Sequence, residues 1–410
     1  MTWVFKPGLT ISFHLRRSTV FKITFYHLIR NKKITLLMLL ALSVTFYFPL
    51  LSNALSSILY QHMMHRAEET PLIVVAKGSR FLSVLNTIYF HTETLDTLPR
   101  RVYDDLQKHK NVKAIPIYNV FRAKVPMDND FKSIPIVATS QDYLNFRGLK
   151  TREGSLFLFP GEIVLGHTLA EKTDLKVGDT ILSEISSLIN LNTIYPLKLR
   201  ITGILAETGT EDDDMIFSDL KSGWIMAGFF HGHGTPLELG KDFILSETND
   251  CAVMKKNVIT YTEITDDNVA SFHFHGDDQE LPLTAIIVLP QDERAAVITA
   301  GRINAQGKYS AYRPNVVMEE FFGLVFAINK IFNSYFILVM SAVICFIAII
   351  VLLSARLRRD EFKTIRILGG SRFMVFKLYF CEYFILVTSS LILALILAGQ
   401  TLSILRNIYM

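Results

Sequence analysis

The chain has 410 residues, of which 50% are hydrophobic, so it is long enough for two or three domains and unusually apolar for a soluble protein. Its 42 basic and 38 acidic residues give a formal net charge of only +4, and its three cysteines exclude a disulfide framework and a CxxC metal or redox pair. The charge is segregated, because residues 1–33 hold seven lysines and arginines and no acid, whereas residues 57–330 hold 35 acidic against 27 basic side chains. This asymmetry indicates that the two regions lie in different compartments.

The basic N-terminal segment, residues 1–33, is predicted to be a cytoplasmic arm. Within residues 10–33, apolar side chains such as Phe13, Phe21 and Leu28 are interspersed with cations. This pattern is typical of an amphipathic helix that lies along the inner leaflet of a membrane. A disordered basic arm is the alternative.

Three apolar runs are each long enough to cross a bilayer, and we predict transmembrane helices at residues 34–58, 331–355 and 374–399. A secretory signal sequence is the alternative for the first run, but the run is too long and no clean small-residue cleavage site follows it. The third run contains Lys377 and Glu382 near its start. A charge at membrane depth is costly and often functional, yet we expect Glu382 to have a structural role, in which it pairs with Lys377 or reaches the membrane interface.

The lysines and arginines that flank these runs predict their direction. The arm has seven, residues 355–377 have another seven, and the tail at 400–410 has one. Because basic flanks stay in the cytoplasm, the N-terminus and residues 356–373 are predicted to be cytoplasmic. Residues 59–330 and the tail are then predicted to lie on the outer side.

The large region at 59–330 shows mixed α/β signals, and we predict two lobes. Segments 71–78 and 281–290 are rich in β-branched residues and bounded by Pro or Gly, so they are predicted to be buried strands that share one sheet. The second strand runs into a helical pattern with Asp292 and Glu293 in its first turn. A β-rich insert at 130–280 is expected to form the second lobe.

Within the insert, residues 162–181 are predicted to be a helix that ends before a Val-Gly-Asp turn and a strand. Residues 197–226 are predicted to be a strand, a polar loop and a helix. After the insert, the helical pattern of residues 315–336 continues into the second apolar run without a breaker. This continuity predicts one long helix that joins the outer region to the membrane.

Four histidines stand in two HxH pairs, His231 with His233 and His273 with His275. Residues two apart in a strand face the same side, so the two pairs together offer four nitrogen donors, the number that zinc takes. Asp277, Asp278 and the acidic run at 211–214 are expected to add oxygen ligands or hydrogen-bond acceptors. The alternative is that the pairs are polar loop residues that never meet, because nothing in the sequence brings residue 231 near residue 273.

Residues 356–373 form a short basic helical pattern that ends at Gly369 and Gly370. With its flanks, as "LSARLRRDEFKTIRILGGSRFMVFKLYFCEYFILV", it resembles the cytoplasmic loop of FtsX/MacB-type (type VII) ABC transporter permeases. Residues 162–226 are similar to the periplasmic domain of that family, including the "GD" turn, the "GIL" strand and the "IFSDL" helix. The resemblance covers nearly the whole chain.

The resemblance implies a multi-pass permease of a bacterial inner membrane, a homodimer that rests on a dimer of cytoplasmic ABC ATPase subunits. Residues 356–373 would be the coupling helix, and the residues implied at the ATPase contact are Arg358, Arg359, Glu361, Arg366, Gly369, Gly370, Ser371 and Arg372. ATP hydrolysis would then move the periplasmic domain, for mechanotransmission, export or extraction, with a periplasmic protein or lipoprotein as a further partner. No nucleic acid is expected as a partner.

The chain departs from the family in one respect. The family usually has four spans, whereas this sequence ends after the third predicted span. We expect a shortened variant rather than a truncated chain, and both alternatives stay open. A missing helix favours a mechanical role over a wide substrate channel.

A catalytic site is not predicted. Residues 301–310 resemble a phosphate-binding loop only superficially, because the spacing from Gly301 to Gly307 is wrong and Tyr309 stands where Ser or Thr should ligate magnesium. We therefore expect ATP hydrolysis in a separate subunit and no nucleotide bound to this chain, with zinc as the one cofactor considered. The alternative function is that of a membrane-anchored periplasmic protein that binds metal or recruits a signalling partner.

Overall fold

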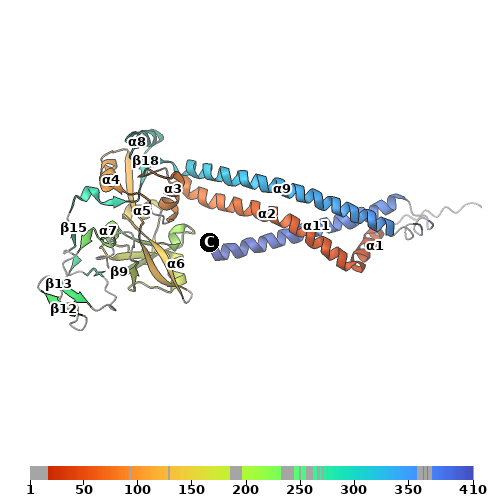
Figure 1. The fold of residues 1–410 in the computed structure, drawn as a ribbon, viewed down its shortest axis with the longest axis horizontal. Coiled ribbons are helices and arrows are strands. Elements are labelled where there is room, and N and C mark those ends of the chain that lie inside the picture. The colour runs from red at the N-terminus through yellow and green to blue at the C-terminus, as the bar shows by residue number, and fades with distance from the viewer. Residues whose placement is uncertain are drawn as a thin grey trace, which may run out of the picture. The chain divides into compact units, whose positions relative to one another are not determined.

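The computed structural model describes residues 17–91, 95–127, 130–184, 196–231, 244–248, 251–254, 262–265, 268–269, 272–274, 276–357, 363, 367 and 372–409. The chain divides into two compact units, which are described separately. Unit 1 consists of Met1–Gln61 and Phe322–Met410, and unit 2 of His62–Phe321. Figure 1 shows the elements of both units in colours that run from red at the N-terminus to blue at the C-terminus.

The described part of unit 1 contains the helices α1 (Arg17–Arg30), α2 (Lys32–Glu69), α9 (Pro314–Leu357) and α11 (Arg372–Tyr409). Among the residues that the structure describes, three helices are long and apolar enough to cross a membrane, namely α2, α9 and α11. Large apolar side chains on them are exposed, for example Leu37 at 69% and Ile337 at 71%. Contiguous exposed apolar surface of this kind is typical of helices whose surroundings are lipid rather than water. The predicted long helix from 315 onward is confirmed as α9.

Polar side chains link α2 to α9 within unit 1. Asn53 and Asn333 exchange two amide hydrogen bonds, of 3.2 and 3.1 Å. One turn away, Asn329 Nδ2 donates to Ser56 Oγ at 2.5 Å. Hydrogen bonds between helices in apolar surroundings contribute about 1 kcal/mol each, so these two contacts fix the register of the two helices.

Glu382 has a partner that the sequence did not indicate. Its Oε1 lies 3.0 Å from Nδ1 of His27 in α1, and His27 Nε2 is 2.8 Å from Asn31 Nδ2. Lys377, the predicted partner, instead places its Nζ 4.7 Å from the centre of the Phe373 ring. Residues 377 and 382 are five apart, which puts them on different faces of a helix, whereas pairs form at spacings of three or four. Glu382 therefore contacts His27 rather than Lys377, which is consistent with the predicted structural role, and its position at the membrane interface stays a prediction.

Unit 2 is organised by a twelve-stranded sheet. One part of it contains β18, β1, β17 and β3 in that order, and β3 continues to β5. Strands β1 and β17 pair directly, with Val74 opposite Ile286, so the predicted sharing of one sheet by these two segments is confirmed. The bounds of these strands are β1 (Leu72–Ala76), β3 (Val112–Tyr118), β17 (Ala285–Pro290) and β18 (Tyr309–Tyr312).

The other part of the sheet closes on itself. Strand β5 pairs with both β4 and β10, and β10 leads through β7, β9 and β8 back to β4, so six strands form a closed ring. Two further strands, β6 and β14, pair with β9. The bounds are β4 (Arg122–Met127), β5 (Asp130–Thr139), β6 (Thr151–Gly154), β7 (Glu162–Leu165), β8 (Thr180–Ser183), β9 (Leu197–Leu205), β10 (Ile216–Asp219) and β14 (Thr262–Glu263).

The ring includes β4, which precedes residue 130, and it is joined to the rest of the sheet through β3 and β5. The ring therefore begins earlier than the predicted insert at 130–280, and the two-lobed layout stays a prediction. Two-stranded sheets pair β2 (Leu98–Pro99) with β16 (Pro282–Leu283), β11 (Phe230–His231) with β15 (His273–Phe274), and β12 (Ile244–Thr248) with β13 (Cys251–Met254).

Short helices follow the strands of unit 2. Helix α8 begins after Asp292, whose carboxylate accepts a hydrogen bond from the N–H of Ala295 at 2.7 Å, so the predicted helix start there is confirmed. The bounds are α3 (Arg80–Tyr89), α4 (Arg100–Gln107), α5 (Gln141–Phe146), α6 (His167–Thr173), η1 (Glu211–Asp214), α7 (Leu220–Met226), η5 (Asp278–Glu280) and α8 (Glu293–Ala305).

Two predicted helices begin with a strand instead. Glu162–Leu165 is β7, and α6 begins only at His167. Likewise, Ile216–Asp219 is β10, and α7 begins at Leu220. Both strands lie in the closed ring, where nearly all their residues are buried. A short apolar run buried on both faces has no alternating pattern, so it cannot be told from a buried helical turn by periodicity.

Candidate functional site

The residues predicted to contact an ATPase lie mostly outside the described residues. Arg358, Arg359, Glu361, Arg366, Gly369, Gly370 and Ser371 are among those the structure does not describe. Arg372 is described at the backbone, where it begins α11. The predicted coupling contact therefore stays a prediction.

Two of the four predicted zinc ligands are neighbours in the fold. Strands β11 and β15 are antiparallel, and their register places His231 directly opposite His273. His233 and His275 lie outside the described residues. Over the described part of the chain, no group of three or more His, Cys, Asp or Glu side chains is arranged to hold a metal ion. Asp277, a predicted extra ligand, accepts a hydrogen bond from the N–H of Gln279 at 3.0 Å at the start of η5.

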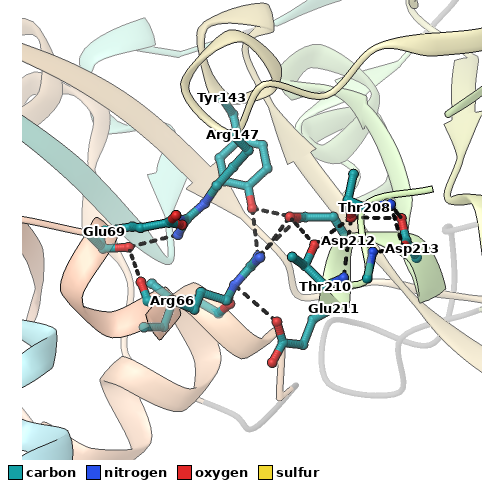
Figure 2. Close-up of polar contacts among 12 residues, drawn as sticks. Arg66, Glu69, Tyr143, Arg147, Thr208, Thr210, Glu211, Asp212 and Asp213 are labelled. Carbon is teal, nitrogen blue, oxygen red and sulfur yellow. Dashed lines mark hydrogen bonds and ion pairs between the residues drawn. The ribbon is translucent and has the colours of Figure 1, made fainter. Parts of the chain in front are cut away.

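A buried ionic cluster that the sequence did not indicate lies at the end of α2. Arg66 is 4% exposed, and its guanidinium donates to Asp212 through Nη1 at 2.7 Å and through Nη2 at 3.0 Å. Nη2 also lies 2.9 Å from the Tyr143 hydroxyl, which donates to the same carboxylate at 2.7 Å. Figure 2 shows how these side chains, from α2, η1 and α5, converge. We call Arg66, Asp212 and Tyr143 the junction triad.

Arg66 makes further contacts through its Nε and the face of its guanidinium. Its Nε donates to the backbone carbonyl of Ile88 and lies 3.5 Å from Glu211 Oε2, and its Cζ lies 5.4 Å from the centre of the Phe90 ring. The two parallel hydrogen bonds between the planar guanidinium and the Asp212 carboxylate fix the orientation of the Arg66 side chain. A lysine ammonium, which is a point charge, would not fix it in this way. The last turns of α2 are thus tied to α3 and to η1 at one point.

The loop that presents Asp212 is itself held rigidly. Its neighbour Asp213 accepts hydrogen bonds from the backbone N–H groups of Thr208 and Gly209, at 2.9 and 2.7 Å. Gly166, before α6, packs so close that a Cβ there would lie 2.3 Å from the carbonyl oxygen of Asp213. Asp212 and Asp213, considered as metal-binding oxygens from the sequence, are instead engaged by protein donors.

A second contact lies beside the triad. Arg147 Nη2 donates to Thr70 Oγ1 at 2.7 Å, and Arg147 Nη1 lies 3.4 Å from Glu69 Oε2 (Figure 2). The hydroxyl of Thr70 donates in turn to the carbonyl of Arg66 at 3.0 Å. Arg147 directly follows α5, the helix that carries Tyr143, so α5 and the residue after it contact the end of α2 through two different side chains.

Electrostatics favour the ionised pair despite its burial. Burial by itself would raise the pKa of Asp212, but the Arg66 guanidinium and the Tyr143 hydroxyl outweigh it and hold the pKa below the usual value. Burial raises the pKa of Tyr143, so its hydroxyl stays protonated and remains a donor. A carboxyl whose pKa is lower in the folded state contributes stability above its unfolded pKa and loses that contribution as the pH falls through the folded pKa.

We therefore predict a specific acid sensitivity. The free energy of unfolding of the native chain should exceed that of Asp212→Asn near neutral pH. This difference should shrink as the pH falls below about 4, where the unfolded carboxyl takes up a proton. Chemical unfolding of both chains at a series of pH values measures the difference. A difference that is independent of pH would contradict the ionic nature of the triad.

Sequence signals for the triad existed but were ambiguous. Arg66 follows the first apolar run by about two turns, which is equally typical of a charge at a membrane interface. The acidic run at 211–214 was expected to add oxygen ligands or hydrogen-bond acceptors to a metal site. Only the fold brings residues 66, 143 and 212 together, because their contact depends on the ring and α5 being in place.

Two family models match the chain. The model described as the MacB-like periplasmic core domain matches residues 36–244, slightly more than half of the chain. The model described as the FtsX-like permease C-terminal matches residues 333–410. Among curated proteins, none matches the chain significantly.

Solved structures with some similarity include the periplasmic region of MacB from Actinobacillus actinomycetemcomitans. That structure is 10% identical, with 62% of this chain and 92% of that chain covered and a TM-score of 0.36. The extracellular domain of the noncanonic ABC-type transporter YknZ from Gram-positive bacteria is also 10% identical. The match covers 59% of this chain and 98% of that chain, with a TM-score of 0.34.

Proposed function

Because the chain belongs to the FtsX/MacB-type family of ABC transporter permeases, we propose that it couples ATP hydrolysis by a separate cytoplasmic ATPase to a conformational change of unit 2. The chain is a permease subunit with apolar membrane helices and a MacB-like periplasmic domain. In our proposal it is not itself an enzyme. It works as a homodimer on two ATPase subunits in a bacterial inner membrane, with its N-terminus in the cytoplasm and its C-terminus in the periplasm.

The observation that supports this proposal is the junction triad. Helix α2 begins at Lys32, contains the first apolar stretch and ends at Glu69, and Arg66 near its end is buried inside unit 2. A buried ion pair resists displacement, because pulling Arg66 away would leave the Asp212 carboxylate buried and unpaired. A force on α2 would therefore be transmitted to unit 2 through the buried contact at the end of the helix.

The start of α9 is packed in a comparable way. This helix begins at Pro314, and the ring of Phe321 stacks on that of Phe81 in α3, with ring centres 4.3 Å apart. Arg80, also in α3, pairs with Glu320 at 2.9 Å. Both helices that leave unit 2 thus make side-chain contacts with α3. We propose that unit 2 receives the movement of the membrane helices through these contacts and uses it for mechanotransmission, export or extraction.

The ATPase contact makes a direct test of the proposal. We expect Glu361→Ala or Gly369→Pro to abolish co-purification of the ATPase, or to separate ATP hydrolysis from any change in unit 2, while unit 2 stays folded. Glu361 would pair with a cation of the ATPase, and Gly369 ends the predicted coupling helix. Pull-down of the tagged permease, followed by ATPase assays, measures both effects. A fully coupled complex from both variants would sink the assignment of residues 356–373.

A second candidate function concerns zinc. The observation that favours it is the register of β11 and β15, which sets His231 opposite His273. The sequence alone provides no reason for these two residues to lie near each other. Directly opposite residues in an antiparallel pair have Cβ atoms about 4.5–5.5 Å apart, a separation at which two imidazoles can share one ion. Under this proposal the periplasmic domain binds zinc, as part of the transporter or as a membrane-anchored metal-binding or signalling protein.

Zinc stoichiometry tests this candidate independently of the ATPase. The purified full chain, loaded with zinc and desalted, should retain about one ion, and His231→Gln together with His273→Gln should remove it. His167→Gln is the matched control, because His167 begins α6 and is not one of the predicted zinc ligands. Equal zinc in the native chain and in the double variant would exclude the site.

A further inference from the structure

A cavity of about 410 Å³ opens in unit 2 at the carboxyl ends of two parallel strands. Strands β5 and β10 run side by side, with Thr139 opposite Asp219 at their last residues, and each strand leads into a short helix. Loops at the carboxyl ends of parallel strands diverge and leave a crevice, which is why ligands commonly bind there. The volume is in the range of ligand pockets rather than of packing defects.

The cavity carries two positive charges. Arg100 and Lys221, from α4 and α7, both line it. Among the described residues, the one carboxylate within ion-pair distance of the Arg100 side chain is that of Asp104 in the same helix, at 3.6 Å. Among the described residues, no carboxylate forms an ion pair with Lys221, whose Nζ lies over the ring of Phe230 at 5.5 Å. These cations stand out because the surrounding region has an excess of acidic residues.

The one carboxyl that lines the cavity, Asp219, forms no ion pair with either cation among the described residues. Asp219 is fully occupied in capping α7, because it accepts hydrogen bonds from Lys221 N at 2.9 Å, from Ser222 N and from Ser222 Oγ. Burial raises the pKa of Asp219. The lining also includes Ser140, whose Oγ is buried and has no hydrogen-bond partner among the described residues. The cavity thus offers cations and an unused hydroxyl, which suit an anionic oxygen ligand.

Apolar groups line the rest of the cavity and its rim. Trp224 forms part of the wall, and its ring lies 5.8 Å from Cζ of Arg100. Leu158 lines the cavity although it is 69% exposed, and the adjacent Phe159 is 58% exposed. The backbone N–H groups of both residues donate to Glu162 Oε2, at 2.8 and 3.1 Å, so these exposed side chains stand on a fixed turn. An exposed apolar rim beside a cationic pocket is typical of a binding surface rather than of a solvated loop.

We propose that this cavity binds a short acidic segment of a partner protein, with a carboxylate between Arg100 and Lys221 and a neighbouring apolar side chain against Trp224 and Leu158. Charge complementarity selects the carboxylate, and the fixed apolar rim selects its neighbour. The inference deepens the proposed function, because it gives the chemistry by which the periplasmic domain recognises a partner. The site needs no ATPase, so its test is independent of coupling.

A peptide selection tests the proposal on the full chain in lipid nanodiscs without any ATPase. A random heptapeptide library is selected on the native chain after depletion on R100Q/K221Q. We expect the recovered peptides to be enriched in Asp or Glu next to an apolar residue. Enrichment without acidic residues, or recovery of no peptide, would overturn the proposal.

Fluorescence anisotropy with the most enriched peptide then measures the contacts. R100Q and K221Q should each weaken binding about tenfold, as expected for loss of one hydrogen bond to a charged group, and so should replacement of the acids in the peptide by their amides. Lys108→Gln is the matched control, since Lys108 is 72% exposed and pairs with Asp105 at the far end of α4. Unchanged melting temperatures show that the variants fold. Equal binding by K221Q and K108Q would contradict the assigned site.

Discussion

Replacing Arg66 by methionine should lower the free energy of unfolding of unit 2 by about 3–5 kcal/mol, the cost of breaking a buried ion pair from one side. Methionine fills a similar volume but offers no donor, so Asp212 would lose two hydrogen bonds and its only cation within 4 Å among the described residues. The Tyr143 hydroxyl would then be the main donor left to the carboxylate. Urea unfolding of the full chain in detergent, followed by the fluorescence of Trp224 in α7, measures the loss.

Arg80→Met provides the matched control for this experiment. Arg80 also pairs with a glutamate, but both side chains are more than half exposed. Exposed ion pairs contribute about 0–1 kcal/mol, so the control should stay within that range of the native chain. A double variant, Arg66→Met with Asp212→Leu, should recover part of the stability, because it removes both charges together. Equal destabilisation by Arg66→Met and Arg80→Met would mean that the triad is not a fixed point of unit 2.

Replacing Gly166 by alanine should destabilise unit 2 by about 1–3 kcal/mol, although alanine adds a single methyl group. The new Cβ would lie 2.3 Å from the carbonyl oxygen of Asp213 and 2.4 Å from that of Asp212. Backbone atoms cannot move away as a flexible side chain would, so η1 must shift, and Asp212 shifts with it. The variant should therefore also reduce the coupling energy between Arg66 and Asp212 in a double-mutant cycle.

Gly301→Ala is the control for the alanine variant. Gly301 lies within α8, and nothing lies within 4 Å of a Cβ built there. Glycine in a helix costs roughly 0.5–1 kcal/mol relative to alanine, so this variant should be neutral or slightly more stable. If Gly166→Ala behaved like Gly301→Ala, the close packing of α6 against η1 would be refuted.

The sequence predicted those parts of the structure that depend on local pattern. Three long apolar helices, the pairing of segments 71–78 and 281–290, and the helix after Asp292 follow from hydrophobic length, β-branched runs and a capping residue. Strands β7 and β10 were taken for helix because short runs buried on both faces carry no periodicity. The family resemblance, carried by the loop at 356–373 and by residues 162–226, agrees with both family models.

Local sequence pattern could not predict the junction triad. Its members are 77 and 146 residues from Arg66 along the chain. The acidic run at 211–214 has the composition of a metal site or a solvated loop, and only the ring and α6 turn Asp212 inward. Glu382 shows the same limit, because its partner His27 lies 355 residues away in α1. Side chains that act across the fold are invisible to reasoning from neighbours on one helix.

A distance measurement in the assembled complex tests the central proposal most directly. A spin label at Lys108→Cys, in a chain whose three native cysteines are replaced by serine, reports the separation of the two periplasmic domains in a homodimer with its ATPase in nanodiscs. We predict that trapping the ATPase in its ATP-bound state shifts the distance distribution, and that Gly369→Pro in the coupling segment removes the shift. Identical distributions with and without ATP, in a complex that hydrolyses ATP, would contradict the proposal that this chain transmits the energy of hydrolysis to its periplasmic domain.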